Sequence, residues 1–454
     1  MAHTQHPVVL IHGVFGYGRQ RPFWNQWAPY WPQRALDAMG ANYRVVDVGA
    51  HARLHGHARY GYTHAVAQHP NWSEDNPVHL VGHSFGATTA IELYQLLCQD
   101  YFGVGSNHKW VKSIVSIAGP LSGTTLTHLF GLHDGKMVAF TLGHAIGAAL
   151  CVWQTLHVQF PALRRLFDYR MPQWEHVASY REALSSTCRI LASYDLAVYD
   201  ILPARRLARN SRLVEMDKPF LVSIATSAHA EVPVAEISLA MLLAVLMGVV
   251  AGGLWYHRYE VATSSALLAV AAAVVLLGRL RDLDYATLPC LTFLRVQMSW
   301  CVRWLHEIFD GFERDEWEPN DGAVNLASML TPLQFRPHGQ EEEVEEDGTS
   351  EDASGSDTDT SGSDAGSTAS TVVSTTGQSA LATASQPLLT THKLHLDLYG
   401  RDDHEPLKKK TALLPGRWYV HQLRKNHMAG THFDRDAPQL FRQLLHLLAT
   451  EAES

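Results

Sequence analysis

Ser84 stands at the centre of the pentapeptide GHSFG, residues 82–86, where a serine hydroxyl could act as a nucleophile. Residues 78–81 are apolar enough for a short buried strand, and the apolar residues that follow recur at helical spacing. A sharp strand-to-helix turn strains its central residue, and glycines two positions away on either side avoid a collision. The segment predicts a serine displayed at a helix N-terminus, which favours developing negative charge. The alternative is a hydroxyl between two glycines with no catalytic role.

A catalytic serine needs a base, an orienting acid and donors for an oxyanion. Residues 8–11 predict a second buried strand, which runs into a His-Gly-Val turn. Hydrolases of this type bring a backbone N–H from such a turn towards the serine. The N–H groups of Val14 and Phe85 are therefore the candidate oxyanion donors. We interpret His12 as a structural residue that fixes the loop, because the oxyanion hole needs only backbone there.

Candidates for the acid and the base lie far along the chain. Asp321 occurs in an Asn-Asp-Gly sequence, and His427 and His432 follow it. The order serine, aspartate, histidine is that of α/β-hydrolases. With 27 histidines and 45 acidic residues in the chain, order alone decides little. An Asn-Asp-Gly sequence is ordinarily only a turn.

Seven stretches, in the same order along the chain, resemble the secreted true lipases of staphylococci and thermophilic bacilli. They lie within residues 6–225 and 315–445. The stretches are residues 8–19, 51–61, 81–90, 116–126, 169–174, 194–198 and 320–329. The resemblance implies an α/β-hydrolase fold, with a mostly parallel central sheet flanked by helices and a helical cap or lid. It also implies the activity of a lipase or another carboxylic ester hydrolase.

The resemblance assigns roles to five residues: Ser84 as nucleophile, Asp321 as acid, His427 as base, and Val14 and Phe85 as oxyanion donors. The histidine base of the family follows a Gly-x-Trp strand, which corresponds here to residues 415–423. His427 lies closer to that strand than His432 does, so His427 is the preferred base.

The resembled lipases hold a zinc ion with two histidines and two aspartates. The histidine pair matches His51 and His57, but neither aspartate has a counterpart, so Asp47 or Asp195 would have to substitute. The alternative is that both histidines form hydrogen bonds within their loop. Ala429 stands where the family has a calcium carboxylate, which argues against calcium. We therefore expect that the reaction requires no cofactor.

Two apolar segments distinguish this chain from the resembled lipases. Residues 237–256 and 261–278 contain no charged side chain, and as helices they would be about 30 and 27 Å long, close to the hydrocarbon thickness of a bilayer. They predict a transmembrane helical hairpin inserted into the hydrolase. A buried hairpin in a soluble protein and a shallow hairpin in a lipid-droplet monolayer are the alternatives. Because candidate catalytic residues lie on both sides of the insertion, the chain must cross a membrane an even number of times.

Two other segments give coarser expectations. Residues 130–167 are apolar but interrupted by histidines, and in the resembled lipases this region forms a lid helix. A fixed cap helix is the alternative, and either would line an acyl pocket.

Residues 339–386 carry eleven acidic and no basic residues, and have too few apolar side chains to fold. The net charge is −9, and without this tract the chain is nearly neutral, so nothing points to nucleic acid.

These features divide the chain into five parts. They are residues 1–230 with the cap at about 127–215, the hairpin at 231–285, residues 286–338 with the acid, a disordered acidic insertion at 339–390, and residues 391–454 with the base.

Five cysteines without paired spacing indicate free thiols in a reducing compartment. No apolar cleavable stretch precedes the first strand, so we expect the chain to start in the cytosol.

We therefore expect a serine-dependent lipase or other carboxylic ester hydrolase that acts on acyl esters at a membrane or lipid surface. The expected partners are a lipid ester substrate and a membrane. The expected location is the endoplasmic reticulum or a lipid droplet, with the catalytic domain facing the cytosol. Two alternatives stay open: an acyltransferase, in which an alcohol replaces water, and a catalytically silent membrane scaffold.

Overall fold

The structure is a computed structural model. It describes residues 4–14, 16–18, 29–47, 54–133, 196–227, 289–335, 385–396 and 412–452, together with single residues and pairs between 136 and 162. The expected hairpin, most of the expected lid and the acidic tract up to residue 384 lie outside the described residues. Among the residues that are described, no helix has the length and apolarity to cross a bilayer.

A seven-stranded sheet forms the centre of the fold, and every pair of neighbouring strands in it is parallel. In order across the sheet, the strands are β10 (Thr391–Lys393), β11 (Trp418–Leu423), β7 (Phe220–Thr226), β4 (Val111–Ile117), β3 (Val78–His83), β1 (Val8–Ile11) and β2 (Tyr43–Val46). The chain runs from β1 outwards to β2 and then returns to the other side of β1 as β3. In open parallel sheets, the carboxyl ends of the strands at such a reversal form the usual ligand crevice.

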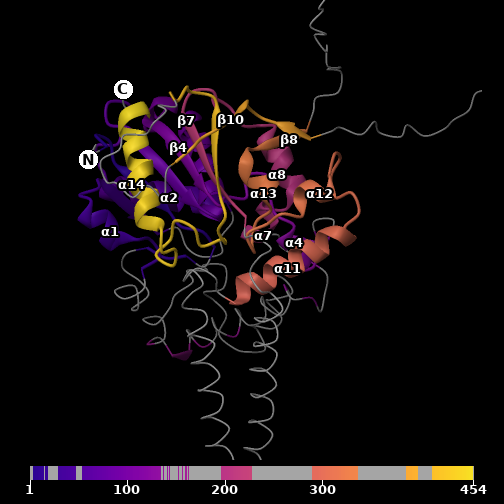
Figure 1. The fold of residues 1–454 in the computed structure, drawn as a ribbon. Coiled ribbons are helices and arrows are strands. Elements are labelled where there is room, and N and C mark those ends of the chain that lie inside the picture. The colour runs from indigo at the N-terminus through magenta and orange to yellow at the C-terminus, as the bar shows by residue number, and fades with distance from the viewer. Residues whose placement is uncertain are drawn as a thin grey trace, which may run out of the picture.

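Helices and short strands surround this sheet (Figure 1). The helices are α1 (Gln33–Ala38), α2 (Leu54–Gln68), α3 (Phe85–Cys98), the short η2 (His108–Trp110), α4 (Leu126–Leu129), α7 (Ala197–Asp200), α8 (Pro203–Asn210), α11 (Pro289–Trp304), α12 (Arg314–Trp317), α13 (Leu326–Leu330), α14 (Ala437–Leu447) and the π-helical η5 (Leu448–Ala452). Two small antiparallel sheets pair β5 (Leu132–His133) with β6 (Lys136–Met137), and β8 (Leu333–Phe335) with β9 (Ser385–Pro387).

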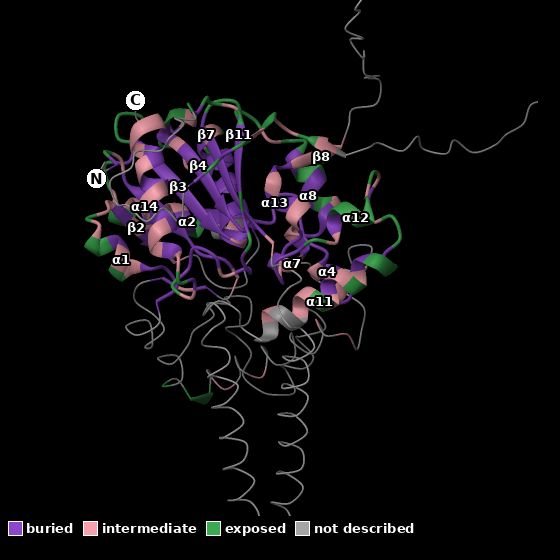
Figure 2. Cartoon of the chain, in the orientation of Figure 1, coloured by how far each residue is buried: buried purple, intermediate pink, exposed green. Residues whose placement is uncertain are grey.

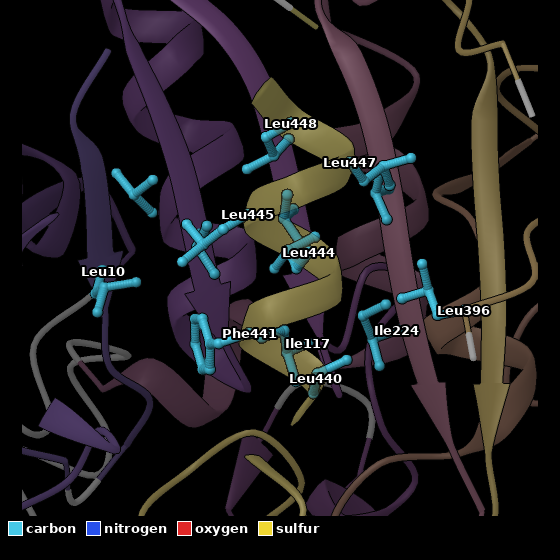
Figure 3. Close-up of a cluster of buried hydrophobic side chains, with 14 of the residues drawn as sticks. Leu10, Ile117, Ile224, Leu396, Leu440, Phe441, Leu444, Leu445, Leu447 and Leu448 are labelled. Atoms are coloured by element: carbon cyan, nitrogen blue, oxygen red, sulfur yellow. The ribbon is translucent and has the colours of Figure 1, made fainter. Parts of the chain in front are cut away.

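Alternation along β1 explains why helices cover both faces of the sheet. Val8 and Leu10 belong to a buried cluster with side chains of α1 and α14, whereas Val9 and Ile11 belong to a second cluster with α2 and α3. Successive side chains of a strand point to opposite faces, so an all-apolar strand needs cover on both. In Figure 2 the central strands β3 and β4 are almost entirely buried, whereas the edge strand β10 is largely exposed. Figure 3 shows Leu440 and Leu444 of α14 beside Ile224 of the sheet.

Two of the strands expected from the sequence are present. The strand expected at residues 8–11 is β1 with the same bounds, and the strand expected at 78–81 extends to His83 as β3. Cys98 and Cys301 carry free thiols, as expected. Residues 385–390 fall within the expected insertion and are described, and residues 385–387 form β9, which pairs with β8.

The packing of α14 can be tested at Phe441, which is fully buried between that helix and the sheet. We expect Phe441→Ala to lower the free energy of unfolding by about 3–5 kcal/mol, because the substitution leaves a cavity against the sheet. Val214→Ala, at a side chain that is 45% exposed, should change it by less than about 0.5 kcal/mol. Urea unfolding of both variants measures the difference, and equal losses would contradict this account of the core.

Candidate active site

Ser84 occupies the turn between the end of β3 and the start of α3. Its backbone has φ 56° and ψ −131°, a conformation that costs energy for a residue with a side chain. Two contacts hold it there: the Ser84 N–H donates to the carbonyl of Ile117, and the Ala87 N–H donates to the Ser84 carbonyl. The hydroxyl therefore stands at the N-terminus of a 14-residue helix.

The two flanking glycines are sterically required, as the spacing of the pentapeptide predicts. A Cβ atom on Gly82 would lie 2.2 Å from the carbonyl oxygen of Gly86. One on Gly86 would lie 2.1 Å from the carbonyl oxygen of Ile11, at the end of β1. Both contacts are with backbone atoms, which cannot move aside as a flexible side chain could. Glycine at position 82 therefore allows the turn to close, and glycine at position 86 allows it to pack against the end of β1.

His427 lies in the loop between β11 and α14 and faces Ser84. Its Nε2 atom is 2.7 Å from Ser84 Oγ, and its Nδ1 atom is 2.9 Å from Asp321 Oδ2. Since an ionised carboxylate can only accept, Nδ1 carries the proton, and Nε2 is left to accept the proton of the serine hydroxyl. The alternative base, His432, is exposed, and its backbone N–H donates to the carbonyl of Tyr30.

Asp321 is fully buried between α12 and α13, and hydrogen bonds fix its orientation. Its Oδ1 atom accepts from the backbone N–H groups of Ala323 and Val324, at 2.9 and 2.8 Å. Its Oδ2 atom accepts from the hydroxyl of Thr226, at the end of β7, at 2.6 Å. The His427 N–H also donates to the Asp321 carbonyl at 3.0 Å, so Asp321 and His427 are joined through the backbone as well.

The loop after β1 passes close to Ser84. A Cβ atom on Gly13 would lie 2.7 Å from Ser84 Cβ and 3.0 Å from Ser84 Oγ. Because Gly13 is this close, the Gly13–Val14 peptide, which carries the Val14 N–H, lies near Ser84. Phe85, the residue after Ser84, is the first residue of α3 and carries the other candidate N–H. His12 is buried, its Nδ1 donates to the Gly13 carbonyl at 2.9 Å, and it fits the structural role expected for it.

Lys425 supports the loop that carries His427, and nothing in the sequence pattern pointed to it. Its side chain is only 4% exposed, and its Nζ atom contacts the carboxylates of Asp434 and, at 2.7 Å, Asp436. Asp434 Oδ2 also accepts from the Gly430 N–H at 2.8 Å. A buried ammonium paired in this way joins the two ends of the loop around His427.

His83 and Tyr30 lie behind the site and were also missed by sequence reasoning. His83 is buried, and its ring centroid lies 5.2 Å from that of His427. Burial, together with the neighbouring His427, lowers the pKa of His83 from 6.5 to about 3. His83 is therefore neutral near neutral pH. Burial also raises the pKa of the Tyr30 phenol, which keeps its proton.

The candidate zinc ligands lie mostly outside the described part of the chain. His51 and Asp195 are outside it, and so is the side chain of His57, whose backbone is in α2. Asp47 is described, and its Oδ1 atom is 3.6 Å from His12 Nε2. Within the described residues, no group of three or more metal-ligating side chains is placed to hold an ion. Zinc binding at His51 and His57 stays a hypothesis.

Comparison with known proteins locates the matching sequence in bacterial lipases. "Lipase 1" of Staphylococcus aureus strain Mu50 is 28% identical over 193 aligned residues, which cover 32% of this chain and 28% of that protein. "Lipase 2" of the same species is 27% identical, with the same coverage. The match thus spans little more than a quarter of the length of these curated relatives. The chain matches no protein-family profile.

Solved structures extend the comparison to the whole chain. Staphylococcus hyicus lipase superposes with a TM-score of 0.54 at 14% identity, over 98% of this chain and 95% of that one. Lipase 1 from Pelosinus fermentans gives 0.52 at 15% identity, over 98% and 99%. EstA from Clostridium botulinum gives 0.52 at 16% identity, over 99% and 88%. The chain has the α/β-hydrolase fold. The resemblance to staphylococcal lipases that the motifs indicated is confirmed.

The low pKa of His83 predicts how the free energy of unfolding changes with pH. A histidine whose pKa is 6.5 when unfolded and about 3 when folded binds its proton first in the unfolded state. Its contribution to stability is complete above about pH 6.5 and is lost as the pH falls towards 3, by up to about 1.4 kcal/mol per pH unit. Urea unfolding between pH 7 and pH 4 should show a shallower loss for His83→Gln than for wild type. Equal slopes would contradict the assignment.

Proposed function

We propose that the protein is a serine-dependent carboxylic ester hydrolase of the lipase type, which acts on acyl esters at a membrane or lipid surface. The observation that carries the proposal is the continuous line of hydrogen bonds from Asp321 through His427 to Ser84. This line lies at the carboxyl ends of the strands of an α/β-hydrolase sheet, beside the reversal between β1 and β3. The staphylococcal relatives, which are named lipases, support the same class of reaction.

In the proposed mechanism, His427 Nε2 takes the Ser84 proton while Ser84 Oγ attacks the ester carbonyl carbon. The carbonyl oxygen becomes an oxyanion, which the N–H groups of Val14 and Phe85 stabilise. The C–O bond to the alcohol then breaks, and His427 gives its proton to the departing oxygen. Water, deprotonated by the same histidine, attacks the acyl-enzyme, and the acid is released as Ser84 recovers its proton. Asp321 stabilises the imidazolium that forms twice in the cycle.

The reaction needs only groups of this chain, so we propose that it requires no cofactor. Backbone donors and the N-terminus of α3 supply the positive potential at the oxyanion, and His427 supplies the proton transfers. Metal analysis of the purified protein tests the zinc hypothesis. One equivalent of zinc that is lost in His57→Ala would establish a site for the ion.

We further propose that the apolar insertion at 231–285 attaches the enzyme to a membrane. Ser84 precedes this segment and Asp321 and His427 follow it, yet the three side chains are in hydrogen-bond contact. A hairpin that returns to the same side of a bilayer is compatible with that contact, and one crossing is not. The proposed location is the cytosolic face of the endoplasmic reticulum or of a lipid droplet, where long acyl esters are available.

Removal of the nucleophile tests the enzymatic proposal most simply. Ser84→Ala should abolish labelling by a fluorophosphonate and lower ester hydrolysis by at least about 10³-fold. His427→Gln should have a comparable effect, whereas His432→Gln, a matched change at the exposed histidine of the same loop, should leave the rate within about twofold. A wild-type protein that is neither labelled nor active would instead favour the silent scaffold.

Alkaline carbonate extraction of membranes from cells that express the full chain tests the attachment. An integral hairpin keeps the protein in the membrane pellet, because carbonate removes only peripheral proteins. Deletion of residues 231–285 should move the protein to the supernatant. Release of the intact chain would contradict the membrane proposal and leave the esterase proposal standing.

A further inference from the structure

Tyr30 lies behind the candidate active site, at a point where three segments of the chain meet. Its side chain is 6% exposed, and it belongs to the buried cluster on the α1 and α14 face of the sheet. The Gly13 N–H donates to Tyr30 Oη at 3.2 Å, and Tyr30 Oη lies 2.6 Å from His83 Nδ1. The phenol therefore joins the loop after β1 to the last residue of β3.

His83 continues this connection to the base. Its Nε2 atom is 2.7 Å from the carbonyl oxygen of His427. A carbonyl oxygen only accepts, so Nε2 carries the imidazole proton and Nδ1 is left to accept from the Tyr30 hydroxyl. The Tyr30 oxygen in turn accepts from the Gly13 N–H. Each N–H or O–H donor between Gly13 and His427 therefore has an acceptor. The direction of every hydrogen bond is fixed because the series begins at a backbone N–H and ends at a backbone carbonyl.

This series of hydrogen bonds connects the loop of the proposed oxyanion donor Val14 with the proposed base His427, which must act together on one substrate. At one end, Gly13 lies against Ser84 and precedes Val14, the proposed oxyanion donor. At the other end is the backbone of His427, whose side chain accepts the Ser84 proton. A shift of either end relative to the other would move the oxyanion donor away from the atom at which the negative charge forms.

We propose that Tyr30 and His83 are positioning residues that fix the distance between the oxyanion-hole loop and the catalytic histidine. The inference rests on the proposed function, since it concerns how that site stabilises its transition state. Neither residue touches the substrate. They act through the Gly13–Val14 peptide and through the backbone of His427.

The structure also explains why the series keeps one orientation. Burial holds His83 neutral and Tyr30 protonated at neutral pH, so the proton positions stay as the geometry requires. A charged His83, with a proton on both ring nitrogens, could no longer accept from Tyr30. It would also place a positive charge beside the ring of His427, which has to become an imidazolium during the reaction.

This role predicts a selective loss of transition-state binding. Tyr30→Phe removes the hydroxyl and frees the Gly13 N–H, so the oxyanion donor loses its fixed position while the surface that binds the acyl chain is retained. We expect kcat/KM for a soluble short-chain ester to fall about 10- to 100-fold, mostly in kcat, because displacement of a catalytic group costs rates of this order. The inhibition constant of an alkyl boronate, which forms a tetrahedral adduct with Ser84, should rise by the same factor.

His83 offers a graded version of the experiment. Glutamine has one acceptor and one donor at its end, so His83→Gln can accept from Tyr30 and donate to the His427 carbonyl. Leucine can do neither. We expect His83→Gln to stay within about fivefold of wild type in boronate affinity, and His83→Leu to lose about 10- to 100-fold.

Tyr43→Phe is the matched control. Tyr43 is also 6% exposed, lies in the same buried cluster, and donates its hydroxyl to Asp37 Oδ1 at 2.7 Å. Like Tyr30→Phe, this change removes one buried phenol hydroxyl, but at a distance from the site. It should lower the unfolding midpoint without changing the inhibition constant of the boronate.

The outcomes separate the inference from the function on which it rests. A Tyr30→Phe variant that is less stable but binds the boronate as wild type does would overturn the inference and leave the esterase proposal standing. Equal losses in His83→Gln and His83→Leu would also count against it. A wild-type protein that neither hydrolyses esters nor binds the boronate would remove the proposed function, and the inference with it.

Discussion

The 2.7 Å contact between His427 Nε2 and Ser84 Oγ joins residues 343 positions apart. It forms only if the sheet and its loops place both side chains correctly. One side of the contact is a serine in a strained backbone conformation at the start of α3. The other is a histidine in a loop held by a buried lysine and by a fully buried aspartate. Both sides follow strands of the same sheet, Ser84 after β3 and His427 after β11.

The parallel sheet makes such a meeting possible. In a sheet whose strands all run in one direction, the segments that follow the strands emerge along the same edge. Ser84 follows β3, the loop with Gly13 and Val14 follows β1, Thr226 ends β7, and the loop with His427 follows β11. Residues from distant parts of the sequence are therefore brought together by strand order alone. The same constraint explains why large insertions between these segments are compatible with the site.

The sequence predicted those features whose physical cause is local. The strand at residues 8–11 and the strand-turn-helix around Ser84 follow from apolar periodicity and from glycines that the turn requires. Asp321 and His427 could not be singled out in this way, because an Asn-Asp-Gly turn and a histidine in a loop are common. Only the order of several matching motifs pointed to Asp321 and His427.

The residues that support the site were missed for a related reason. Tyr30 contacts His83 across 53 positions, and His83 contacts the backbone of His427 across 344. Such partners have no spacing that a pattern could reveal, and a buried tyrosine or lysine looks like any other in the sequence. His83 was visible only as the variable position of the serine pentapeptide. Its hydrogen bonds, and the burial that keeps it neutral, are properties of the fold.

We propose that Ser84, His427 and the N–H groups of Val14 and Phe85 converge on one reacting carbonyl. A crystal structure of the protein after reaction with a fluorophosphonate tests this most directly, because the phosphonyl group imitates the tetrahedral intermediate. We expect a bond from phosphorus to Ser84 Oγ, with the phosphonyl oxygen within hydrogen-bond distance of both N–H groups and His427 beside Oγ. A phosphonyl group on another residue, or one whose oxygen points away from both donors, would contradict it.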